Sequence, residues 1–169
     1  MSIRRGFLRN QRGSATIEFA MASLFLFGIM LVGLDFGIYA QQNLRLGGAM
    51  QQAAVVAFNN RASSTVDTSS LGNYVSAAAG GSPTMSYQCN GGSCSGTWTS
   101  MCIGAPTASG GWPTFAAATT SNGKPSCADG ATPGNYLVMR ATRTYQAVVV
   151  PDNYLGGKTM TQQVIVRLS

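Results

Sequence analysis

The sequence offers few residues that could carry out chemistry. It contains no histidine, four cysteines and five carboxylates. Histidine is the commonest general base and metal ligand, so its absence argues against hydrolytic and metal-dependent sites. Four carboxylates are isolated, mostly beside turn-forming residues, which is typical of turn or capping aspartates. They are Asp35, Asp67, Asp129 and Asp152. We expect a protein that is not an enzyme and holds no metal or cofactor.

The fifth carboxylate, Glu18, lies inside an apolar segment. Residues 15–34 read ATIEFAMASLFLFGIMLVGL, with Glu18 as their one charge. A helix of twenty residues spans roughly 30 Å, the thickness of a bilayer's hydrocarbon core. A carboxylate within such a helix is energetically costly and therefore indicates a function.

The charge distribution predicts the orientation of this helix. Four arginines lie in the first thirteen residues, at positions 4, 5, 9 and 12, and they account for most of the formal charge of +6. By the positive-inside rule the leader stays in the cytoplasm and the chain after residue 34 lies outside. The other basic residues are scattered and form no stripe that could neutralise successive phosphates, so we expect no nucleic-acid partner.

The residues around the start of the apolar segment resemble a prepilin-peptidase site. Gly13 would precede the cut, and Glu18 would become the fifth residue of the mature chain, followed by Phe19. Cleavage would create an ammonium group on Ser14, about one helical turn from Glu18. A carboxylate in apolar surroundings needs a positive partner. The resemblance implies that this partner is the N-terminus of a neighbouring subunit.

Two other interpretations of the N-terminus remain open. The string Arg4-Arg5-Gly6-Phe7-Leu8-Arg9 fits a twin-arginine export signal, which would deliver a soluble binding protein beginning near Met50. A signal anchor that is never processed would instead keep Met1.

The pattern after the membrane segment predicts one long helix over residues 14–59, with a kink at Gly47-Gly48 left open. Apolar side chains recur at near-helical spacing, and glutamines supply a polar side. The apolar set is Leu34, Ile38, Leu44, Ala49, Ala53, Val56 and Ala57. We expect this face to cover a small antiparallel sheet in an α+β fold.

The remainder of the chain predicts short elements and loops. A short helix is expected at 71–79, ended by Gly80-Gly81, and a strand at 97–99 within otherwise long loops. Alternating apolar residues from 135 to 150 and from 160 to 168 predict a hairpin, turning at Pro151-Asp152-Asn153. The expected organisation is a leader at 1–13, a membrane helix at 14–34, its amphipathic continuation at 35–59 and an extracytoplasmic domain at 60–169. Within that domain, residues 87–133 are the cysteine-rich loop region and 135–168 the hairpin.

The cysteines predict disulfides rather than a zinc site. Cys89, Cys94, Cys102 and Cys127 lack the paired CxxC spacing of structural zinc ligands. An even number of cysteines in an exported domain favours two disulfides, for which three pairings exist. We favour 89–94 with 102–127 because each of these pairs closes locally.

Taken together, the leader, the Gly…Glu-Phe helix, the acidic-Phe-Gly exit from the membrane and the C-terminal hairpin resemble the TadE-like family. The resemblance covers residues 4–58, is weaker over 135–169, and does not extend to the cysteine-rich middle. It implies a pilin-like fold and a minor pilin or pseudopilin of the tight-adherence (Flp) pilus. The implied partners are the prepilin peptidase, other pilin subunits and the bacterial inner membrane. The family usually has tyrosine where this chain has Phe19.

Overall fold

The computed structural model describes residues 14–61, 66–95, 98–106, 111–121, 123–151 and 154–169. The predicted leader and Gly13 lie outside these residues, as do Thr97, Asp152 and Asn153. The elements, in chain order, are helices α1 (Ser14–Asn59) and α2 (Thr68–Ala79), and strands β1 (Thr84–Cys89), β2 (Met101–Pro106), β3 (Pro113–Ala117), β4 (Thr119–Ser121), β5 (Lys124–Ser126), β6 (Tyr136–Thr144) and β7 (Thr159–Arg167).

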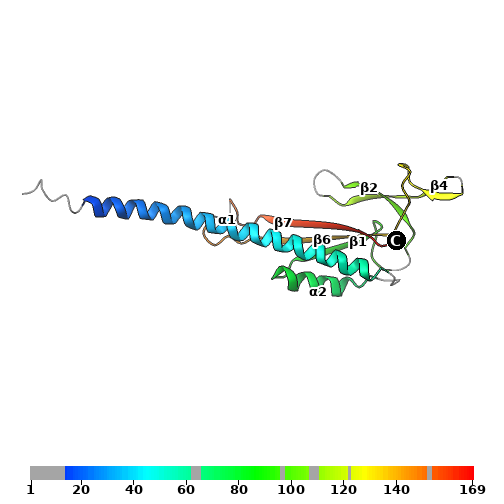
Figure 1. Cartoon of the computed structure of the whole chain (residues 1–169), viewed down its shortest axis with the longest axis horizontal. Helices are drawn as coiled ribbons and strands as arrows, with labels where there is room; N and C mark the ends of the chain where they lie inside the picture. The colour runs from blue at the N-terminus through cyan, green and yellow to red at the C-terminus, as the bar shows by residue number, and fades with distance from the viewer. Residues whose placement is uncertain (1–13, 62–65, 96–97, 107–110, 122, 152–153) are drawn as a thin grey trace, which may run out of the picture.

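A long helix packed on small antiparallel sheets confirms the α+β prediction. The main sheet has three strands in the order β1-β6-β7, and β2-β3 and β4-β5 form separate two-stranded sheets. The second half of α1 lies along the main sheet beside α2, whereas its first half extends away from the domain (Figure 1). The molecule is therefore a stalk with a domain at one end.

One face of the main sheet, one face of α1 and one face of α2 form the core. Leu137, Met139 and Ala141 of β6 are buried against α1. Their neighbours in β7 are Val166, Val164 and Gln162. Because side chains alternate across a strand, this periodicity of two is the one that the sequence displays.

The buried face of α1 differs in part from the predicted one. Ala49, Ala53 and Ala57 are buried as expected, but Leu44 is 76% exposed and Leu34 is also exposed. The largest fully buried apolar side chains on this half of the helix are instead Leu46 and Met50. Which face of α1 is buried depends on how the helix is rotated against the sheet. The spacing of apolar residues along α1 is compatible with more than one buried face.

The predicted short helix is present and begins three residues earlier than expected. The carboxylate of Asp67 accepts hydrogen bonds from the N–H groups of Ser69 and Ser70, at 3.0 and 3.1 Å. Gly80, with φ +67°, ends the helix in the left-handed conformation that favours glycine. The hydroxyl of Ser70 and then its N–H group lower the pKa of Asp67. The aspartate therefore acts as an N-cap.

The cysteine-rich region is more ordered than predicted. Trp98 and Thr99 lie in no strand, so the strand expected at 97–99 is wrong within the described residues. Two hairpins, β2-β3 and β4-β5, occupy what was expected to be loops. Their strands are short and rich in small residues, so periodicity gave little signal for them.

The predicted C-terminal hairpin is also shorter than its apolar pattern. Strand β6 ends at Thr144, and residues 145–158 form a long connection to β7. Val149, expected on the buried face, is 43% exposed. The N–H groups of Val148, Val149 and Val150 bind a side chain of α1 and not β7.

Replacing a buried and an exposed leucine of α1 with alanine should show which side of the helix packs on the sheet. Leu46→Ala should lower the free energy of unfolding by about 2–5 kcal/mol, because it leaves a cavity between helix and sheet. Leu44→Ala, two residues away, should change it by less than about 0.5 kcal/mol. Urea denaturation in detergent micelles measures both. Equal losses would show that α1 does not pack on the sheet in this orientation.

Candidate assembly helix and its anchor on the domain

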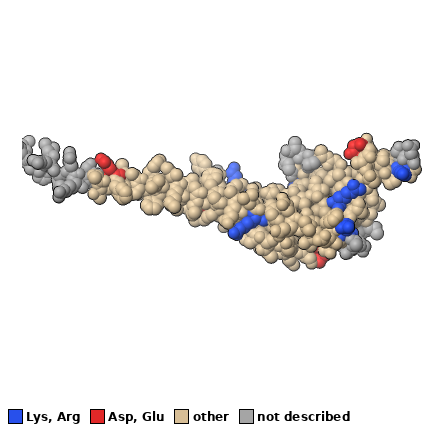
Figure 2. Space-filling view, viewed as in Figure 1, with Lys and Arg blue, Asp and Glu red and all other residues tan. Residues whose placement is uncertain are grey.

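The N-terminal half of α1 is an apolar surface that the domain does not cover. Within the described residues, α1 is the one helix long and apolar enough to cross a membrane, and its most apolar stretch has no buried residue. Figure 2 shows this half of the helix as an almost uncharged rod. A single-pass membrane anchor accounts for a helix that is apolar on every side.

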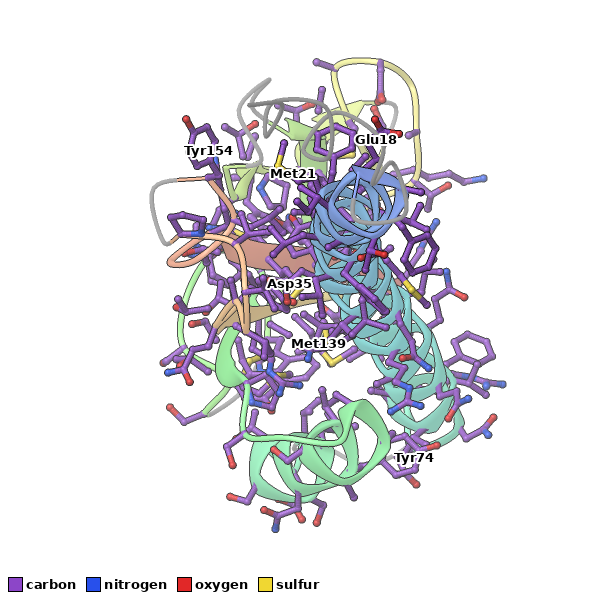
Figure 3. All side chains as sticks on the ribbon, turned by 90° about the vertical axis from the view of Figure 1, so that its left-hand side faces the viewer. Glu18, Met21, Asp35, Tyr74, Met139 and Tyr154 are labelled. Carbon is purple, nitrogen blue, oxygen red and sulfur yellow. A yellow bond between two sulfur atoms is a disulfide. The ribbon has the colours of Figure 1, made fainter. Side chains whose placement is uncertain are left out.

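The predicted processing and assembly residues lie at the free end of this rod. Ser14 is the first residue of α1, and Glu18 and Phe19 follow on its exposed first turns. Glu18 points outward at the end of the helix nearest the viewer in Figure 3. Residues four apart lie on one side of a helix, so Glu18 and the start of the helix share a face. Among the residues that the structure describes, no part of the domain encloses this end.

The four cysteines form two disulfides at the other end of the molecule. Cys89 pairs with Cys94 across a tight turn at the end of β1, and Cys102 of β2 pairs with Cys127 just after β5. These are the pairs that local closure favours. The second one links the two small hairpins, which have little apolar material of their own.

Asp35 joins the two parts of the molecule, a role that the sequence did not reveal. It lies in the middle of α1, immediately after the apolar segment, and its side chain is only 1% exposed. Burying a carboxylate without partners is strongly unfavourable, so its surroundings must compensate.

The partners of Asp35 come from the connection between β6 and β7. One carboxylate oxygen, Oδ2, accepts hydrogen bonds from the N–H groups of Val149 and Val150, at 2.8 and 2.7 Å. The other, Oδ1, accepts from the N–H group of Val148 at 3.0 Å and from the hydroxyl of Tyr145 at 3.1 Å. Three successive N–H groups directed at one anion form a backbone nest. Such charge-assisted hydrogen bonds are stronger than neutral ones.

Tyr145 reinforces this junction. Its hydroxyl also donates to the backbone oxygen of Asp35 at 3.0 Å, and its ring meets that of Tyr39 edge-on, with centroids 5.3 Å apart. Burial raises the pKa of Tyr145, and the hydrogen bond to Asp35 and the charge of Asp35 raise it further. The hydroxyl therefore remains protonated and available as a donor.

The other described aspartates have the local roles that were expected. Asp67 caps α2, and Asp129 accepts a hydrogen bond from the N–H group of Ala131 at 3.0 Å, within a turn. Asp35 differs because it lies within a predicted helix, where there is no turn or helix start to cap. Its position inside a predicted helix was the signal in the sequence that Asp35 has another role. The sequence did not indicate its partners, which lie 110 or more residues away.

The sequence of this helix matches a known protein family. Residues 13–55 match the family of TadE-like proteins. This stretch begins at Gly13 and continues past Asp35 into the half of α1 that packs on the domain. The match confirms the resemblance noted in the sequence over these residues. No curated protein and no solved structure matches the chain.

Substituting Asp35 should loosen the connection without unfolding the sheet. In Asp35→Asn, one oxygen is replaced by an NH₂ group, which cannot accept a hydrogen bond. We expect the amides of Val148, Val149 and Val150 to exchange hydrogen about tenfold faster or more. Hydrogen exchange with mass spectrometry in detergent micelles measures this.

Asp129→Asn provides the matched control, because Asp129 is an exposed aspartate whose partner is local. It should leave exchange at residues 148–150 unchanged. If Asp35→Asn also leaves it unchanged, the carboxylate does not hold the connection.

Proposed function

We propose that this protein is a minor pilin or pseudopilin of a tight-adherence pilus or secretion apparatus. In this proposal the prepilin peptidase cleaves between Gly13 and Ser14, and the mature subunit assembles through α1. The observation that carries the proposal is the position of the TadE-like match relative to the uncovered part of α1. The match covers residues 13–55, and the large apolar side chains from Ile17 to Met30 within it are 56–78% exposed.

The uncovered face of α1 supports assembly through this helix. At Gly33 and Gly37, no atom beyond the neighbouring residues and backbone of α1 itself lies within 4 Å of where a Cβ would be, so a second helix has room to approach closely. Leu44 and Val55 lie on the same side of α1, opposite Leu46, and both are exposed. Exposed apolar side chains therefore continue along this side of α1 beyond the membrane segment, interrupted by the exposed Gln51.

The burial of Met50 disfavours the twin-arginine alternative. A soluble product beginning near Met50 would lose Leu46 and Ala49, which are buried in the core with Met50. It would also lose Asp35 and leave three N–H groups of the connection without their acceptor. An unprocessed anchor would keep these contacts, so only the N-terminus itself distinguishes it from the pilin.

The mature N-terminus tests the proposal. We expect protein from native membranes to begin at Ser14, with or without an N-methyl group, as measured by intact mass and N-terminal sequencing. Gly13→Leu should block processing and leave Met1 in place, because a bulky side chain would occupy the cleavage position. Gly6→Leu makes the same change within the leader and should be processed normally. A native chain that retains Met1, or begins near Met50, would contradict the proposal.

The charge of Glu18 should matter for assembly and not for cleavage. Glu18→Gln keeps the size of the side chain but removes its charge, so it should yield mature protein that forms far fewer cross-linked complexes in membranes. Glu18→Asp keeps the charge and should retain more of them. If both variants assemble like the native chain, Glu18 does not pair with a neighbouring N-terminus.

A further inference from the structure

The connection between β6 and β7 carries an apolar surface with no role in the core. Val148 is 76% exposed and Tyr154 is 74% exposed, and Val149 beside them is partly exposed. These three side chains belong to one connection of the domain. Exposed apolar residues that gather in this way usually mark an interaction site.

This surface lies where the helix leaves the apolar segment. The N–H groups of residues 148–150 bind the carboxylate of Asp35, the first residue after the predicted membrane helix. In Figure 1 the connection is the part of the domain that extends farthest along α1 toward its N-terminus. Figure 3, viewed from that end, shows Tyr154 standing to one side of the helix.

The exposure of side chains along α1 shows how far the domain extends toward the N-terminus of the helix. The large apolar side chains from Ile17 to Met30 are 56–78% exposed, but Leu31 and Val32 are only 44% and 42% exposed. Leu31 and Val32 lie four and three residues before Asp35, respectively, and share its side of the helix. One turn closer to the N-terminus, at Gly28, no atom beyond the neighbouring residues and backbone of α1 lies within 4 Å of where a Cβ would be. The cover therefore ends about one turn inside the apolar segment.

We propose that Val148, Val149 and Tyr154 insert into the interfacial region of the membrane that α1 spans, on the side of the domain. The connection is held at that depth by Asp35, so its exposed apolar side chains meet lipid when the helix is inserted. Tyrosine favours this region, where its ring is among apolar groups and its hydroxyl meets water. The proposal does not involve Asp152 and Asn153, which lie outside the described residues.

This contact would give the anchor a second point of attachment. A single helix leaves a domain free to tilt and rotate about its exit point, whereas a second contact to one side of it restricts both motions. The domain would then present the uncovered face of α1 in a fixed orientation before assembly. The inference requires only that α1 spans a membrane, and it does not depend on cleavage at Gly13.

Spin labels on the full chain test the proposal in liposomes of phosphatidylcholine and phosphatidylglycerol. All four native cysteines are in disulfides, so a label reacts with one introduced cysteine. Val148→Cys and Tyr154→Cys place the label on the connection. Phe25→Cys places it in the membrane helix, and Ser69→Cys places it on an exposed residue near the start of α2. Accessibility to oxygen and to a water-soluble nickel complex is measured by power saturation.

We expect the oxygen-to-nickel ratio at positions 148 and 154 to be several-fold higher than at 69 and lower than at 25. A ratio at 148 and 154 equal to that at 69 would place the connection in water and overturn the proposal. Protection from both reagents that disappears when the protein is diluted in lipid would assign the surface to a second copy of the chain, which also overturns it. If position 25 itself is accessible to nickel, the anchor fails, and that result is distinct from failure of the connection alone.

Discussion

A buried carboxylate in the middle of the long helix fastens that helix to the C-terminal part of the chain. The N–H groups of residues 148–150 lie beyond the end of β6 and need a hydrogen-bond acceptor, and the buried carboxylate of Asp35 needs hydrogen-bond donors. The hydrogen bonds between them meet both needs. The length of β6, the path of the connection and the point at which α1 meets the domain all follow from this exchange.

Helix α1 suits a membrane on one side of Asp35 and a folded domain on the other, because its pattern of apolar residues changes at Asp35. Before Asp35 the helix is apolar all round, which suits lipid or other helices. After it, one side is buried by the sheet and α2, and the opposite side keeps leucine and valine exposed. A continuous rod of this kind transmits the position of the membrane segment directly to the domain. In a subunit that assembles through its helix, this rigidity sets the spacing of the domains.

The cysteine-rich region lies apart from this arrangement. Its β2-β3 hairpin contacts the outer face of the sheet, where the guanidinium of Arg140 stacks over the ring of Trp112 at 4.6 Å and Phe115 lies near Tyr136. The disulfides compensate for a shortage of apolar side chains there. The TadE-like match ends at residue 55, well before this region.

The sequence by itself determined the features that depend on neighbouring residues. These include the membrane-length helix, the alternation of the C-terminal strands and the short helix ended by Gly80-Gly81, because each is encoded within a few turns of chain. For the disulfides the sequence favoured the observed pairing but left three pairings possible. Only the tertiary structure decided which leucines of α1 are buried, where β6 ends and what Asp35 binds. Those outcomes depend on how a helix settles against a sheet more than 100 residues away in the chain. Several faces of α1 satisfy the same periodicity, and the need to pair the buried carboxylate with free N–H groups selects one of them.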